Sequence, residues 1–178
     1  ARARAPVISV LRGPLLPPPA TRPSSRRRSP RALPDARSYS ALISALGSGG
    51  EWRHALELLR EMEAKEIAPH VRTYNSAIAA CEHSRLWEHA VELLREMAQR
   101  GVPPDAYSYE SAISACRHGG ELEKAIELLR EMDAAGLRPS AFAYNQALNA
   151  CRLRGAAERA LSLLREMGEH AAPNTYSY

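Results

Sequence analysis

The pentapeptide Leu-Leu-Arg-Glu-Met occurs at residues 58–62, 93–97, 128–132 and 163–167, and each copy begins 35 residues after the previous one. Tyrosine recurs in step with it, at Tyr39, Tyr74, Tyr109 and Tyr144. A period of this length indicates a solenoid, in which each repeat packs mainly against its neighbours. The period defines four repeats, 36–70, 71–105, 106–140 and 141–174, of which the last is one residue shorter.

Each repeat contains two helical patterns, which are clearest in repeat two. The first consists of Tyr74, Ala77, Ile78 and Cys81, and the second of Trp87, Ala90, Val91, Leu94 and Met97. Spacings of three and four residues place each set on one face of a helix. We therefore expect an all-α protein in which 36–174 forms eight helices in four stacked antiparallel pairs. The tyrosine, tryptophan and methionine stripes are predicted to form the core.

Glycine and proline mark the helix boundaries. Gly119-Gly120 separates the two helices of repeat three, as Gly49-Gly50 does in repeat one. At the end of repeat two, Gly101 can adopt the left-handed conformation and Pro103-Pro104 prevent the helix from continuing.

The formal net charge of +4 hides an uneven distribution. The chain has 24 basic and 20 acidic residues, and residues 1–34 hold eight arginines and no acidic residue. Residues 35–178 therefore carry 16 basic and 20 acidic side chains, a net charge of about −4. A nucleic-acid partner must accordingly be held by a local surface and not by bulk charge.

Residues 1–34 also contain eight of the thirteen prolines. Such a segment buries too little apolar surface to fold, so we expect it to be disordered. A composition rich in arginine, with serine and without acidic residues, is typical of an organellar transit peptide. This interpretation places the protein in the mitochondrion or chloroplast. A basic linker, or a nuclear signal around Arg26–Arg28, are the alternatives.

The three cysteines, Cys81, Cys116 and Cys151, fall one per repeat. This spacing does not match a metal site, and it predicts small buried residues in a reduced compartment. No apolar run approaches the roughly 20 residues of a membrane span. We also find no nucleophile–base arrangement, phosphate loop or metal cluster in the sequence, and expect a non-enzymatic, monomeric protein that needs no cofactor.

The period and two motifs resemble the pentatricopeptide repeat family. These motifs are Arg-Thr-Tyr-Asn-Ser-Ala-Ile at 72–78 and Gly-Val-Pro-Pro-Asp at 101–105. The resemblance covers 36–174 and extends to Thr175–Tyr178, which looks like the start of a fifth repeat. The even 35-residue length resembles the plain subclass. The resemblance implies a right-handed α-α superhelical solenoid whose first helices line a concave groove and bind single-stranded RNA, one base per repeat.

In this family the fifth and last residues of a repeat contact the base edge, and the second residue packs against base faces. The resemblance therefore implies base reading by Ser40 with His70, Asn75 with Asp105, Glu110 with Ser140, and Asn145 with Asn174. It implies base stacking by Arg37, Arg72, Tyr107 and Phe142. The Asn75–Asp105 pair resembles a uridine reader and the Asn145–Asn174 pair a cytidine-preferring one, whereas the other two pairs depart from the familiar combinations.

Several of these residues have a second interpretation. Asp105, Ser140 and Asn174 precede a helix and are good N-cap residues whatever they bind. Arg117 and Arg152, together with His118, are candidates for phosphate contacts, although Glu82 occupies the position equivalent to Arg117.

Two functions remain open at this point. The first is RNA binding in organellar RNA processing, stability or translation. The second is a protein-binding helical scaffold of the tetratricopeptide type, because a concave solenoid can also hold a peptide or a helix. A positive groove favours the first function, and a dry apolar groove favours the second.

Overall fold

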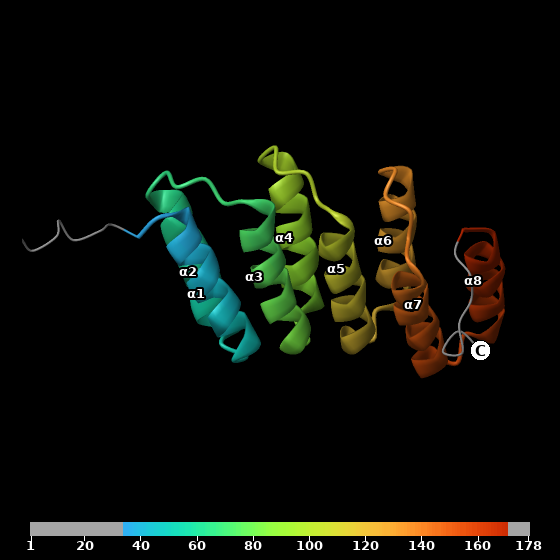
Figure 1. Ribbon diagram of the computed structural model, residues 1–178. Helices are drawn as coiled ribbons and strands as arrows, with labels where there is room; N and C mark the ends of the chain where they lie inside the picture. The colour runs from blue at the N-terminus through green and yellow to red at the C-terminus, as the bar shows by residue number, and fades with distance from the viewer. Residues whose placement is uncertain (1–33, 171–178) are drawn as a thin grey trace, which may run out of the picture. The chain divides into compact units, whose positions relative to one another are not determined.

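The computed structural model describes residues 34–170. This part of the chain contains α1 (Ala36–Ser48), α2 (Trp52–Ala64), α3 (Val71–His83), α4 (Trp87–Gln99), α5 (Ala106–Gly119), α6 (Leu122–Ala134), α7 (Ala141–Arg154) and α8 (Ala157–His170). The helices follow one another in pairs joined by two or three residues (Figure 1). The prediction of eight helices in stacked pairs is confirmed for these residues. Residues 1–33 and Asn174, for which we made predictions above, lie outside the described range.

The two helices of each pair belong to different layers. Consecutive first helices contact one another directly, α1 with α3, α3 with α5 and α5 with α7. Within the described residues, no Cα atoms of consecutive second helices come within 8 Å of each other. The first helices are therefore the more closely spaced layer, and they carry the fifth residues predicted to read bases, Ser40, Asn75, Glu110 and Asn145.

The predicted stripes form one continuous core. The methionines at the ends of the pentapeptides, Met62, Met97, Met132 and Met167, are fully buried, as is Tyr74. The cysteines are buried free thiols, which confirms their prediction as small core residues. The tryptophans differ from the prediction, because Trp52 and Trp87 are only partly buried. Each is the first residue of its helix and packs at the edge of the core.

The second helix of repeat two ends as its sequence predicts. Gly101 has φ 74°, and the backbone N–H of Val102 donates to the carbonyl of Met97 at 2.9 Å. This hydrogen bond satisfies a carbonyl that would otherwise lack a partner at the helix end. Leu137 makes the same bond to Met132 one repeat later, at 3.1 Å.

Ion pairs connect the second helices across the repeats. The arginine of each pentapeptide contacts the glutamate of the next pentapeptide: Arg60 with Glu96 at 3.7 Å, Arg95 with Glu131 at 3.1 Å, and Arg130 with Glu166 at 3.9 Å. We call these three pairs the outer ladder. Three further glutamates on the same helices, Glu57, Glu92 and Glu127, are exposed.

Candidate nucleic-acid interface

Asn75 and Asp105 form a preorganised polar pair between two repeats. The side-chain amide of Asn75, on α3, donates to both carboxylate oxygens of Asp105, at 3.1 and 3.3 Å. Asp105 is the N-cap of α5, and its carboxylate accepts the backbone N–H of Ser108 at 2.9 Å. The Ser108 hydroxyl lies 2.6 Å from the amide oxygen of Asn75 and 2.9 Å from Oδ1 of Asp105, and it can donate its one proton to either oxygen. The cap interpretation of Asp105 is therefore confirmed, and the same carboxylate also orients Asn75.

The charge of Asp105 is stabilised by these contacts. Burial raises the pKa of the carboxyl, but hydrogen bonds from the Ser108 backbone, the Ser108 hydroxyl and the Asn75 amide outweigh burial and hold the pKa below its usual value. Asp105 is consequently an ionised acceptor at neutral pH. The Asn75 amide carries two N–H groups, so the pair can offer a donor and an acceptor to a ligand.

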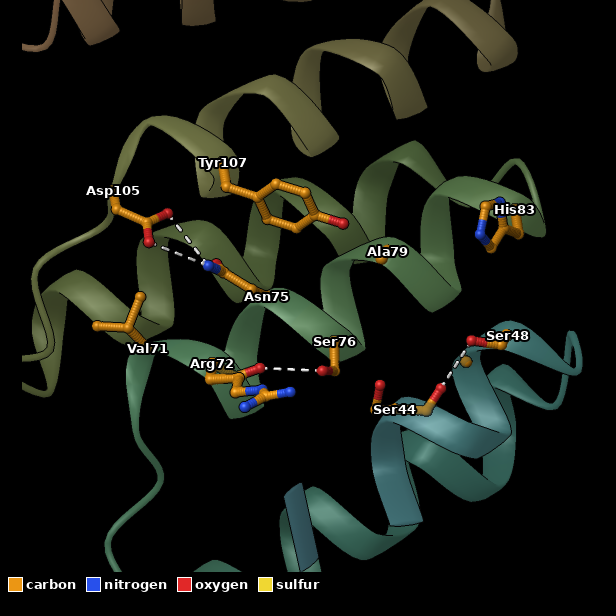
Figure 2. A pocket seen from close by; sticks show the side chains of 11 residues that line it. Ser44, Ser48, Val71, Arg72, Asn75, Ser76, Ala79, His83, Asp105 and Tyr107 are labelled. Atoms are coloured by element: carbon orange, nitrogen blue, oxygen red, sulfur yellow. Dashed lines mark hydrogen bonds between the residues drawn. The ribbon is translucent and has the colours of Figure 1, made fainter. Parts of the chain in front are cut away.

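A pocket of ≈ 590 Å³ brings together residues from three repeats. Asn75, Asp105, Arg72 and Tyr107 line it, as do serines of α1. Figure 2 shows Asn75 and Asp105 facing each other at one end, with the Tyr107 ring beside Asn75. The two predicted base-reading residues of repeat two and the second residues of repeats two and three therefore meet in one cavity. We call it the repeat-two slot.

An equivalent cavity of ≈ 730 Å³ lies one repeat earlier. Its lining includes Ser40, His70, Arg37 and Arg72, the base-reading and stacking candidates predicted for this position. The Ser40 hydroxyl donates to the Ala36 carbonyl at 2.7 Å. We call this cavity the repeat-one slot.

In repeat three, the Ser140 hydroxyl donates to Glu110 at 2.5 Å. Ser140 is the N-cap of α7 and accepts the backbone N–H of Ala143 at 3.2 Å, which confirms its cap interpretation. The stacking candidates Tyr107 and Phe142 are 54% and 51% exposed, which is unusual for large apolar rings in this chain. In repeat four, Asn145 is half-buried on α7.

Sequence reasoning missed a hydroxyl at the third position of the repeats. The Thr73 hydroxyl lies 2.6 Å from that of Ser40, and Ser108 contacts Asn75 in the same way. In both cases the third residue of one repeat fixes the fifth residue of the repeat before it. The recurrence of a hydroxyl at 35-residue spacing was a usable signal, and Ala143 breaks it in repeat four.

His83 also lines the repeat-two slot, at the end opposite Asp105 (Figure 2). Histidine recurs after 35 residues, at His83 and His118, and this recurrence could have pointed to the position in the sequence.

The phosphate candidates differ in their surroundings. Arg152 is exposed, and its Nε lies 3.4 Å from the side-chain oxygen of Asn149. Arg117 is half-buried, with its guanidinium against the His118 ring. Burial, followed by the charge of Arg117, lowers the pKa of His118, so this ring is neutral at neutral pH and Arg117 carries the positive charge.

The cysteines and potential metal ligands of the described residues do not form a catalytic or metal-binding site. Burial raises the pKa of Cys81 and of Cys116 to about 12, so neither thiol forms the nucleophilic thiolate at neutral pH. Among residues 34–170, no cluster of histidine, cysteine and carboxylate side chains is arranged to hold a metal ion. None of the described helices combines the length and apolar composition that a bilayer span requires.

Three sequence profiles match the chain. The PPR repeat family matches residues 34–83 and 69–118, the PPR repeat matches 107–137, and the pentatricopeptide repeat domain matches 127–178. A search of curated protein sequences finds no match.

Solved structures similar to this chain are also of pentatricopeptide repeat proteins. The pentatricopeptide repeat protein PPR10 in complex with an 18-nt psaJ RNA element is 31% identical, with a TM-score of 0.70 over 84% of this chain. A second structure, of PPR10 from maize, is 30% identical, with a TM-score of 0.65 over 85% of this chain. The chain spans 22% of the PPR10 chain. The PPR domain of Arabidopsis thaliana protein-only RNase P 1, in complex with tRNA, shares the fold at 20% identity and a TM-score of 0.69, covering 79% of this chain and 77% of that domain.

Proposed function

Because the chain belongs to the pentatricopeptide repeat family, we propose that it binds single-stranded RNA sequence-selectively, with one base held at each repeat. PPR10 was solved in complex with an RNA element, and the PPR domain of protein-only RNase P 1 in complex with tRNA. By analogy with the family, the bound RNA is an organellar transcript whose processing, stability or translation the protein controls.

The observation that carries this proposal is the repetition of one arrangement. In both slots the fifth and last residues of a repeat line the same cavity as the second residues of that repeat and of the next. Such a slot offers hydrogen-bonding groups to a base edge and side chains to the two base faces. The repeat-two slot combines the Arg72 guanidinium with the Tyr107 ring, and both groups can stack on a base.

The pocket chemistry favours RNA over a protein ligand. A groove for an amphipathic helix is lined by apolar anchors. The repeat-two slot instead contains an ionised carboxylate, an amide and an arginine. Paired bases hide the edges that Asn75 and Asp105 would read, so single strands should bind better than duplex.

The test is a titration of the full chain with short randomised RNAs at two salt concentrations, with single-stranded and duplex competitors. Four repeats contact about four nucleotides, so we expect weak binding that strengthens at low salt. Binding of duplex as strongly as single strands would contradict the proposal. An absence of RNA binding even at low salt would leave the protein-binding scaffold as the function.

Asn75→Ala provides a sharper test at one position. We expect this variant to lose its preference for uridine at a single base, by roughly tenfold, and to keep its preferences at the neighbouring bases. Sequencing the RNAs retained from a randomised pool measures this change. Because Asn75 is buried, thermal unfolding of the variant must show that it remains folded. An unchanged preference in a folded variant would remove Asn75 from the recognition surface.

We further propose delivery to the mitochondrion or chloroplast by residues 1–34, on the basis of their composition. Fusion of these residues, behind a start methionine, to a fluorescent reporter should send the reporter to one of these organelles. A cytosolic or purely nuclear reporter would support the linker or nuclear-signal alternative.

A further inference from the structure

The base-edge groups of repeat three are chemically different from those of repeat two. Repeat two has an amide beside a carboxylate, Asn75 with Asp105. Repeat three has a carboxylate beside a hydroxyl, Glu110 with Ser140. Because α3 and α5 are equivalent helices of neighbouring repeats, this exchange changes the hydrogen-bonding groups at equivalent positions.

The only proton of the Ser140 hydroxyl is used within the protein. It is donated to Oε1 of Glu110, while the Ser140 oxygen accepts the backbone N–H of Ala143. An ionised carboxylate accepts hydrogen bonds and donates none. Repeat three therefore presents acceptors, and no donor, to a base edge.

Glu110 also has an oxygen available for a ligand. In repeat two, the Ser108 hydroxyl occupies the amide oxygen of Asn75. The equivalent residue above Glu110 is Ala143, which has no hydroxyl. Among the described residues, Ser140 is the one side chain that hydrogen-bonds to Glu110, and it uses Oε1, so Oε2 is unoccupied by protein.

Only one RNA base presents two adjacent donors on its Watson–Crick edge. Guanine has N1–H beside the exocyclic N2–H. Uracil has one donor between two acceptors, whereas cytosine and adenine each have one amino donor beside a ring-nitrogen acceptor. A pair of carboxylate oxygens therefore matches guanine and meets at least one acceptor on every other base.

The faces of this site also suit a purine. The second residues of repeats three and four, which correspond to the residues lining the two earlier slots, are Tyr107 and Phe142, and both rings are half exposed. The repeat-one slot has arginines in these places and the repeat-two slot has one arginine and one tyrosine. Two aromatic rings give the larger stacking area that a purine can use.

We propose that repeat three selects guanine in single-stranded RNA, with the Glu110 carboxylate accepting N1–H and N2–H of the base. This inference rests on the proposed RNA-binding function. It predicts a guanine directly adjacent to the uridine that Asn75 reads.

The experiment uses the full chain and short RNAs that keep this uridine and carry guanine, adenine, cytosine or uracil at the adjacent position. We expect guanine to bind on the order of tenfold more tightly than the others. Inosine lacks the N2 amino group, so it should lose most of that preference. 7-Deazaguanine retains the Watson–Crick edge, so it should bind like guanine.

Glu110→Gln tests the residue itself. Glutamine offers one donor and one acceptor, so the variant should lose the preference for guanine over adenine and keep the uridine preference at Asn75. Glu57→Gln, on the exposed face of α2, is the matched control and should retain the guanine preference.

Three outcomes would overturn the inference. Equal binding of guanine and inosine would exclude a contact with N2–H, and a guanine preference that survives Glu110→Gln would exclude the carboxylate. Uridine selection at Asn75 without guanine selection beside it would refute the inference alone. An absence of binding to every RNA would refute the proposed function together with it.

Discussion

The side chains that would read bases also begin the helices of the next repeat. Asp105 and Ser140 each accept a backbone N–H in the first turn of a helix while contacting Asn75 and Glu110, respectively. Capping holds the groups in position before a ligand arrives, which lowers the entropy cost of binding. For this reason, a substitution of either residue affects stability and recognition together, whereas Asn75 and Glu110 separate the two properties better.

Gly119 provides a residue-scale test of packing between helices. A Cβ atom at this position would lie 2.3 Å from Cδ1 and 3.0 Å from Cγ of Trp87. These atoms are close to the base of the indole side chain, so α4 and α5 would have to move apart. We expect Gly119→Ala to lower the free energy of unfolding by about 1–3 kcal/mol, as measured by urea denaturation.

Gly49 is the matched control, because it lies 70 residues earlier at the equivalent position of repeat one. A Cβ atom there would meet nothing closer than 3.5 Å, and its φ of −83° suits any residue. Gly49→Ala should therefore be neutral or slightly stabilising. Equal destabilisation by both substitutions would show that the contact with Trp87 is not the cause.

At the scale of helices, the outer ladder and the core contribute differently. The ladder arginines Arg60, Arg95 and Arg130 have side chains that are 66%, 47% and 68% exposed. Ion pairs of this kind are worth at most about 1 kcal/mol each and weaken with salt. Burying a methionine contributes about 1.5–3 kcal/mol. The core therefore determines stability, while the ladder favours one alignment of neighbouring second helices.

The carboxyl group of Glu63, on the second helix of repeat one, has an unusual environment. Glu63 on α2 has a side chain that is 12% exposed and lies against Glu96 on α4. Burial, followed by contact with Glu96, raises the pKa of Glu63, and the nearby charges of Arg100 and Arg60 oppose the rise without cancelling it. The Tyr74 hydroxyl, 3.4 Å from Glu63, also faces this carboxyl.

This raised pKa predicts a pH-dependent effect of Glu63→Gln. The folded state binds the Glu63 proton more tightly than the unfolded chain does. This tighter proton binding stabilises the folded state fully at pH values below the ordinary glutamate pKa, and the stabilisation is lost as the pH rises through the raised pKa of Glu63. Glutamine removes the charge, so the variant should be more stable than the parent at neutral pH, and the gain should disappear in acid.

Urea denaturation of both proteins at neutral and acidic pH measures this effect. Glu57→Gln, an exposed substitution on the same helix, should change stability little at either pH. A gain for Glu63→Gln that is the same at both pH values would mean that its cause is packing and not ionisation.

The elements were predictable because their information is local and repeated. Stripes of three- and four-residue spacing, together with Gly101 and Pro103, define the helices of repeat two without reference to the rest of the chain. The contact between Ser108 and Asn75 spans 33 residues and depends on the distance between α3 and α5. Sequence patterns do not specify that distance. The second, fifth and last residues that meet in each slot were therefore predictable from the resemblance, whereas the hydrogen bonds that orient them were not.

At the scale of the whole array, the charges are divided between the two layers of helices. The second helices carry the outer ladder and the exposed glutamates Glu57, Glu92 and Glu127. In repeats three and four the last turns of the first helices carry the positive charges of Arg117, Arg152 and Arg154. This separation is compatible with the proposed binding of RNA despite the acidic net charge of residues 35–178, because a strand bound along the first helices would lie beside these basic residues and away from the exposed glutamates of the second helices.

The last prediction tests that separation through the salt dependence of binding. Each arginine that neutralises an RNA phosphate releases condensed counterions, and it contributes a slope of about −0.7 to log K against log salt for a single strand. We expect the double variant Arg117→Ala and Arg152→Ala to weaken binding to all sequences and to flatten this slope by up to about 1.4. The uridine preference at Asn75 should persist, because phosphate contacts carry no base information.

The two arginines should contribute unequally to this change in slope. Arg152 is exposed, whereas Arg117 is half-buried against His118, so Arg152→Ala should account for the larger part of the change. Arg165→Ala, at an exposed position on α8 in the other layer, removes one positive charge, as the single variant Arg152→Ala does, and should leave the slope unchanged. If Arg165→Ala flattens the slope as much as Arg152→Ala does, RNA responds to the overall charge of the protein and not to the ends of the first helices.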